Sequence, residues 1–175
     1  MAAGAPRRRS AVDRYGLTIR IMPRATLLDR QDELQERFAG LRSDSPRRWG
    51  RMTAHQMVCH CTDAFRNLLG ERPVAPSVPS HPVRARMLKW LALYAPTHWP
   101  RGMKTRPEAD QEQGGTPPDE FERDVKKLNL ACERFAKNLA TVSARPHFLF
   151  GKLSEREWAR WAYLHLDHHL RQFGL

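Results

Sequence analysis

Histidines near the C-terminus have the spacing that a metal site needs. His165 and His169 stand four residues apart within an apolar helical pattern that runs from Trp158 to Phe173. A helix advances about 100° per residue, so side chains four residues apart lie on the same face. His60 lies midway along a second pattern of this kind, Met52 to Leu69. Three imidazoles from two packed helices could bind one divalent ion and leave a coordination position open, as catalytic metal sites do.

Polar and aromatic residues could complete this site. Gln56 and Asp63 share a helical stripe with His60, because they lie four residues before it and three residues after it. Such side chains can orient a coordinating imidazole or hold a substrate. On the C-terminal helix, Gln172 could orient a substrate and Trp161 could form a wall of the pocket. These four residues are the candidate cofactor- and substrate-binding set, and the sequence names no catalytic residue.

Other histidines and cysteines give weaker signals. Cys59, His60 and Cys61 are consecutive, and neighbours on a regular helix diverge by about 100°, so these three side chains cannot converge on one ion. We interpret the two cysteines and Cys132 as small core residues, with a reactive thiol as the alternative. His168 is expected beside the ligands or at the surface. Three histidines in loops are interpreted as incidental: His81, His98 and His147.

The composition indicates one globular domain. The chain has 175 residues, of which 41% are hydrophobic, and this is enough for a single core. No apolar run approaches the ~20 residues that span a bilayer, so we expect no membrane partner. Three cysteines without a regular framework argue against a disulfide-stapled secreted domain and favour a cytoplasmic protein.

The positive charge is concentrated at the start of the chain. The formal net charge is +11, and five arginines fall in the first twenty residues: Arg7, Arg8, Arg9, Arg14 and Arg20. We predict a disordered basic tail over residues 1–22, with an organelle-targeting peptide as an alternative, and one domain over residues 23–175. No aromatic residues alternate with the basic ones as in a single-strand binding platform, so a nucleic-acid partner is not expected.

Apolar periodicity predicts four long helices and no strand pair. Their approximate ranges are 26–41, 53–70, 118–142 and 154–174. Between the second and the third lies a long connection, 71–118, with a short helix near 83–94 that presents Met87, Trp90, Leu91 and Tyr94 on one side. A connection of this length crosses a bundle or covers a site, and we expect both. The prediction is an all-α four-helix bundle, with a crossover between helices two and three that carries an extra short helix.

Two segments resemble a known family. Residues 49–60, W-G-R-M-T-A-H-Q-M-V-C-H, resemble the second helix of the DinB/YfiT-like superfamily, and residues 165–172, H-L-D-H-H-L-R-Q, resemble the H-x-x-H-H-x-x-Q signature of its fourth helix. Residues 114–118, G-G-T-P-P, and 157–161, E-W-A-R-W, are similar to an uncharacterised branch, a domain of unknown function. The resemblance covers about residue 23 to the end.

This resemblance implies a bundle that holds zinc, nickel or iron through His60, His165 and His169. It implies a small-molecule substrate and a homodimer, and it favours a thiol-dependent transferase that uses a low-molecular-weight thiol. The alternatives are a metal-dependent hydrolase and a non-catalytic helical binding module. The long crossover and the cysteines beside His60 depart from the family pattern and leave the substrate class open.

Overall fold

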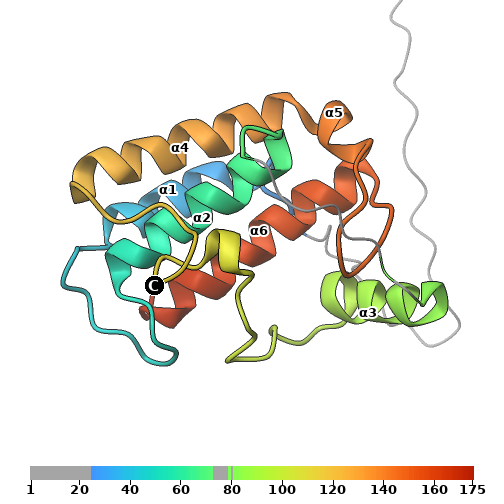
Figure 1. The fold of residues 1–175 in the computed structure, drawn as a ribbon, viewed down its shortest axis with the longest axis horizontal. Coiled ribbons are helices and arrows are strands. Elements are labelled where there is room, and N and C mark those ends of the chain that lie inside the picture. Colours follow the sequence, from blue (N-terminus) through green and yellow to red (C-terminus); the bar gives the residue numbers. More distant parts are fainter. Residues whose placement is uncertain (1–24, 73–78, 80) are drawn as a thin grey trace, which may run out of the picture.

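The protein is helical throughout the part described by the computed structural model, residues 25–72, 79 and 81–175, and no strand occurs there. The elements in order are α1 (Gln31–Ala39), α2 (Ala54–Leu69), α3 (Pro82–Tyr94), the 3₁₀ turn η1 (Pro107–Ala109), α4 (Phe121–Lys137), α5 (Leu139–Ser143) and α6 (Glu155–Gln172) (Figure 1). The predicted all-α architecture is confirmed. The predicted tail over residues 1–22 and the boundary at residue 23 lie outside the described residues.

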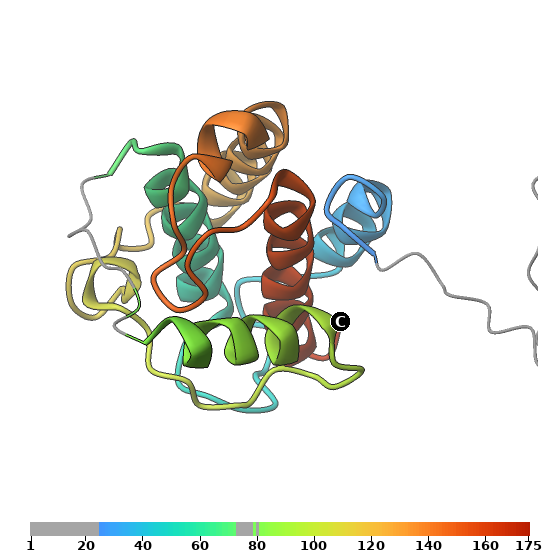
Figure 2. The same ribbon diagram turned by 90° about the vertical axis from the view of Figure 1, so that its right-hand side faces the viewer.

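The bundle consists of α1, α2, α6 and the consecutive pair α4 and α5. Helix α2 packs against α4, α5 and α6, and α6 also packs against α1 and α5. Figure 2 shows α6 between α2 and α1, with α4 and α5 above them. The apolar stripes of these helices meet in one core, whose largest fully buried side chains include Trp158, Phe65, Phe135, Met57, Leu128 and Leu166. None of the described helices has the length and apolar character needed to cross a membrane.

Both helices that carry the histidines begin with the predicted caps. The Thr53 side chain accepts a hydrogen bond from the Gln56 backbone N–H, and the Gln56 side chain accepts one from the Thr53 backbone N–H. Ser154 and Glu157 form the same reciprocal pair at the start of α6. Each pair satisfies two N–H groups that a helix start leaves without partners, so both helix starts are well defined.

Two predicted helices differ in extent from the observed ones. The first begins at Gln31 rather than Thr26, because Thr26 donates to the Asp29 carboxylate at 2.8 Å and closes a turn instead of capping a helix. The third is interrupted at Asn138, which has φ −116° and ψ 23° and separates α4 from α5. Its side-chain amide donates to the Arg134 carbonyl at 2.7 Å, a local bond that competes with helix continuation.

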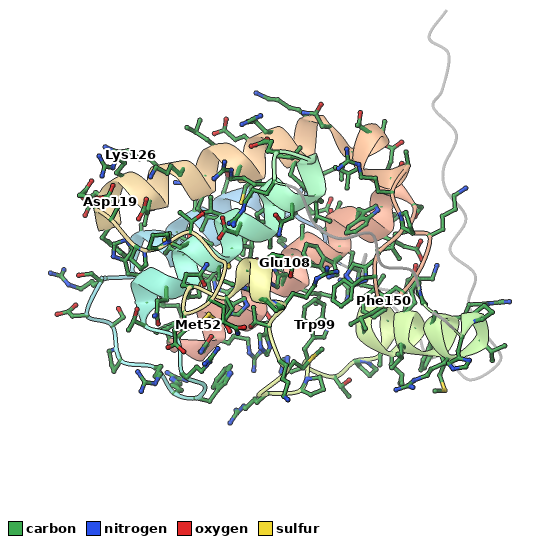
Figure 3. All side chains as sticks on the ribbon, in the orientation of Figure 1. Met52, Trp99, Glu108, Asp119, Lys126 and Phe150 are labelled. Carbon is green, nitrogen blue, oxygen red and sulfur yellow. The ribbon has the colours of Figure 1, made fainter. Side chains whose placement is uncertain are left out.

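The crossover between α2 and α4 is anchored at Asp63. This carboxylate is fully buried and accepts hydrogen bonds from the backbone N–H and the hydroxyl of Thr116, each at 2.7 Å, and it pairs with Arg72 at 2.5 Å. The crossover therefore returns to α2 before α4 begins. On the way, α3 packs against α6 and η1 packs against α2. In Figure 3, Trp99 and Glu108 lie on this connection.

Candidate metal centre

The structure brings the three predicted histidine ligands together. His60 comes from α2, and His165 and His169 come from successive turns of α6. One ring nitrogen from each lies within 4.8 Å of the others, and Nε2 of His60 is 3.2 Å from Nε2 of His165. All three side chains are buried. Nitrogen ligands about 2.0–2.1 Å from a tetrahedral zinc ion lie about 3.3 Å apart, so the closest pair already has the separation of two ligands.

Hydrogen-bond partners orient two of these rings. Nδ1 of His60 lies 2.8 Å from the carbonyl oxygen of Ala109 in η1. Nδ1 of His169 lies 3.1 Å from the side-chain oxygen of Gln172, whose amide nitrogen in turn donates to the Trp49 carbonyl. Both partners are acceptors, so each Nδ1 carries the hydrogen and each neutral Nε2 carries a lone pair. Metal-binding histidines are commonly oriented in this way.

His165 differs from the other two. Its Nδ1 is buried and has no hydrogen-bond partner among the described residues, whereas its Nε2 lies beside that of His60. Trp161 stacks on the His165 ring, with centroids 4.8 Å apart and an interplanar angle of 20°. The ring is therefore positioned by packing on one face, and either nitrogen can carry its hydrogen.

The electrostatic environment keeps the three rings neutral. Burial lowers the pKa of His60 below its ordinary value, although the Ala109 carbonyl and two nearby carboxylates oppose this effect. Burial lowers the pKa of His165 and His169 much further, and the neighbouring imidazoles add to the effect. Neutral imidazole is the form that binds a metal ion. The donor set, its neutrality and the orientation of its lone pairs fit a divalent cation.

The crossover covers the centre. The Trp99 ring lies 6.3 Å from the His165 ring and 6.1 Å from the His168 ring, and its Nε1 donates to the Ala92 carbonyl at 2.8 Å. The Ala109 carbonyl covers His60 from a second direction. Neither group was predicted from the sequence. A backbone carbonyl leaves no mark in the sequence, and Trp99 stands in a Pro-rich loop without periodicity.

Comparison with known families covers nearly all of the described structure. A family model matches residues 29–174, a range that includes every described helix and the three histidines. Its description is "Protein of unknown function (DUF1569)". The chain belongs to this family. No curated protein and no solved structure matches the chain.

Two of the four candidate binding residues in this DUF1569 protein contact the histidines directly. Gln172 bonds His169, and Trp161 stacks on His165. The Gln56 side chain belongs to the cap of α2, and Asp63 anchors the crossover. Roles of these four residues in cofactor or substrate binding stay predictions.

Another histidine, His55, lies in a polar cluster separate from the three-histidine centre. Nε2 of His55 lies 2.8 Å from the Asp124 carboxylate, and the Cys59 thiol lies 3.5 Å from the same oxygen. Lys127 and the backbone N–H of Asp119 also donate to Asp124. These donors satisfy the carboxylate without an ion, so we interpret the cluster as a structural network between α2 and α4.

Proposed function

We propose that this DUF1569 protein binds one divalent metal ion through His60, His165 and His169 and is a metal-dependent enzyme that acts on a small molecule. The supporting observation is the convergence of buried, neutral imidazoles, two of which have their Nε2 lone pairs set by acceptors at Nδ1. Nε2 of His60 and Nε2 of His165 face each other at 3.2 Å, and two buried lone pairs at this distance would be stabilised by a shared cation.

A three-histidine donor set suits zinc, nickel or iron. When bound, such an ion acts as a Lewis acid and lowers the pKa of a water or thiol ligand toward neutrality. We favour thiol-dependent group transfer with a low-molecular-weight thiol, because the histidine-bearing helices resemble those of the DinB/YfiT-like superfamily. Metal-dependent hydrolysis is the second candidate.

The surrounding residues have roles that follow from their contacts. Gln172 and the Ala109 carbonyl orient His169 and His60. Trp161 holds the His165 ring by stacking. Trp99 covers the centre and limits access by water, so that charge at the centre is poorly screened. A substrate must therefore reach the histidines past the crossover.

The decisive experiment measures metal bound to the full chain purified without a histidine tag. Elemental analysis after reconstitution with zinc, nickel or iron should find about one ion per chain. The double variant His60→Ala, His169→Ala should bind none, because one imidazole alone is a weak ligand. A matched control removes two exposed histidines, His81→Ala and His98→Ala, and should keep the ion. Unchanged metal content in the first variant would disprove the proposed centre.

Catalysis needs a separate test, because a helical module could bind a metal ion without reacting. An exchangeable water on the bound ion, detected by water-proton relaxation with a paramagnetic substitute, would indicate an open coordination position. A screen of thiol-transfer and hydrolysis substrates would then separate the two candidate reactions. A stable protein that binds none of the three metals would favour the non-catalytic alternative.

A further inference from the structure

Helix α3 presents an apolar face to solvent. Its exposed apolar residues are Val83 (82% exposed), Met87 (57%), Trp90 (59%) and Leu91 (45%). Their spacing of four, three and one residues places them on one side of the helix. Periodicity predicted this side from Met87, Trp90, Leu91 and Tyr94. The first three face solvent, whereas Tyr94 is half-buried against the core.

Contacts on the opposite side of α3 set this orientation. Ala85 and Leu93 are buried in the interface with the bundle. Lys89, on this inner side, pairs with Glu157 at 2.9 Å. In the last turn of α3, the half-buried Tyr94 reaches the same carboxylate with its hydroxyl, which donates at 3.0 Å. Because the inner face is held by packing and by these bonds, the outer apolar face cannot rotate inward without breaking them.

Basic residues flank the apolar face on both sides. At 100° per residue, Arg84 lies beside Leu91 and Arg86 lies beside Trp90, and both arginines are exposed. Neither has an ion-pair partner among the described residues. No acidic residue occurs in the sequence between Glu71 and Glu108. The segment from 81 to 107 contains the basic residues Arg84, Arg86, Lys89, Arg101, Lys104 and Arg106.

The connection after α3 extends the same outer edge. Figures 1 and 2 show α3 and the segment that follows it together along one side of the bundle, with no other helix outside them. Met103 in this segment is 57% exposed. An apolar helix face and a cationic border therefore lie at one edge of the molecule.

We propose that α3 is an interfacial helix that docks the protein on an anionic lipid surface. Helices that lie in the membrane interface bury an apolar face containing Trp or Leu, while Arg or Lys at its border contacts the lipid head groups. Met87 and Trp90 would enter the acyl boundary, and Arg84 and Arg86 would contact head-group phosphates. A membrane partner is not expected from the sequence, but the lack of a long apolar run excludes only a spanning segment.

The charge distribution favours a lipid surface over other partners. A second copy of the chain would offer the arginines no acidic residue from its own segment between 72 and 107. A nucleic acid would satisfy the arginines but would leave the aliphatic side chains of Val83 and Leu91 without apolar contacts. An anionic membrane satisfies both parts of the face.

The test measures binding of the full chain to vesicles of phosphatidylglycerol and phosphatidylcholine, with pure phosphatidylcholine vesicles for comparison. Wild type should sediment with the anionic vesicles only. Met87→Ser with Trp90→Ser should reduce the partition coefficient at least about tenfold, because the apolar contacts supply insertion. Leu130→Ser is the matched control, since Leu130 is a similarly exposed apolar residue on α4 (58%), and it should change nothing.

A charge-reversal pair tests the border of the face. Arg84→Glu with Arg86→Glu should lower binding by about fivefold or more per residue. Lys126→Glu with Lys137→Glu, two exposed lysines of α4, should have little effect. Absent vesicle binding, or binding that is unchanged in the α3 variants and so arises elsewhere, would overturn the proposal. A change from dimer to monomer in Met87→Ser, Trp90→Ser without vesicle binding would instead assign the face to a second copy.

Discussion

The side-chain oxygen of Gln172 lies 3.1 Å from Nδ1 of His169, and the same side chain donates to the Trp49 carbonyl at 2.9 Å. One amide therefore connects a proposed metal ligand on α6 with the loop that precedes α2. Its two bonds use the oxygen and the nitrogen of the amide, which determines the orientation of the group. A side chain without these atoms could not replace it.

Replacing Gln172 with Met should weaken metal binding while the fold is kept. Methionine fills a similar volume but accepts no strong hydrogen bond, so His169 would lose the partner that sets its tautomer. We expect a loss of about 10–100-fold in zinc affinity, measured by competition with a chromogenic chelator. Gln35→Met, at an exposed position of α1, is the control and should bind zinc as wild type does. Equal affinities in both variants would show that Gln172 does not position the ligand.

Gly50→Ala should displace the side-chain amide of Gln172 by a direct clash with its nitrogen. Gly50 has φ +78°, and a Cβ there would lie 2.6 Å from Nε2 of Gln172. Gly102 has φ +75° but open space around it, so Gly102→Ala reproduces the backbone strain without the clash. Both variants should lose about 1–2 kcal/mol of stability, whereas zinc affinity should fall only in Gly50→Ala. An equal loss of zinc affinity in Gly50→Ala and Gly102→Ala would show that the effect does not arise from the contact with Gln172.

Asp63→Ala should be among the most destabilising substitutions in the chain. Asp63 is fully buried. Its carboxylate accepts two hydrogen bonds from Thr116 and forms an ion pair with Arg72. Its removal leaves buried donors without an acceptor, and we expect a loss of about 3–5 kcal/mol in the free energy of unfolding by urea. Asp32→Ala, at an exposed site on α1, should change this free energy by about 0.5 kcal/mol or less. A small effect of Asp63→Ala would mean that the crossover is held by other contacts.

His147 should make the protein sensitive to acid. Burial lowers the pKa of His147 to about 3, and its Nδ1 accepts a hydrogen bond from the Leu149 backbone N–H, which requires the unprotonated nitrogen. The unfolded chain, with a pKa of about 6.5, binds a proton that the folded chain does not. Stability from the neutral ring is therefore present above pH ~6.5 and is lost as pH falls toward ~3, by about 1.4 kcal/mol per pH unit.

The variant His147→Phe checks this origin, because His147 already stacks on Phe150 with centroids 4.3 Å apart. Urea unfolding at pH 7 and pH 5 should show a smaller acid-induced loss than in wild type, by about 2 kcal/mol. The exposed variant His81→Phe should keep the loss seen in wild type. An unchanged pH dependence in His147→Phe would assign the sensitivity to the other buried histidines.

The cysteines should be unreactive in the folded protein. Burial raises the pKa of Cys59 to about 12, with a further contribution from Asp124, and it raises the pKa of Cys61 and Cys132 as well. Thiolate is the reactive form, so a thiol-specific reagent at pH ~8 should label the buried Cys59 and Cys61 only as fast as the protein unfolds, and the half-buried Cys132 slowly. Ser43→Cys, at an exposed position, provides a thiol that should react at once. Rapid labelling of a native cysteine would support the reactive-thiol alternative.

The local patterns predicted the parts of the structure that depend on local physics. Capping boxes at Thr53 and Ser154 predicted where α2 and α6, the helices that carry the histidines, begin, because the hydrogen bonds of each box lie within four residues. The four-residue spacing of His165 and His169 placed both on one face for the same reason. That His60 lies beside them was predicted from the apolar stripes of α2 and α6, which indicated that the two helices pack together.

Other features depend on contacts between distant residues. The sequence could not show that Ala109 would offer its carbonyl to His60, because the contact spans 49 residues and involves backbone. Periodicity found an apolar side of α3 but could not tell whether it faces the core or solvent. Asn138 interrupts a strong apolar stripe through one local side-chain bond, which averaged periodicity overlooks.

The bonds between Asp63 and Thr116 have a consequence for the order of folding. They close a chain segment of 53 residues, and the entropy lost in closing it precedes any gain from the contact. The contact between His60 and His165 closes a longer segment, of 105 residues, so we expect the crossover to dock on α2 before α6 completes the bundle. The three histidines would then come together in a late step, after the Ala109 carbonyl of the crossover has already oriented His60.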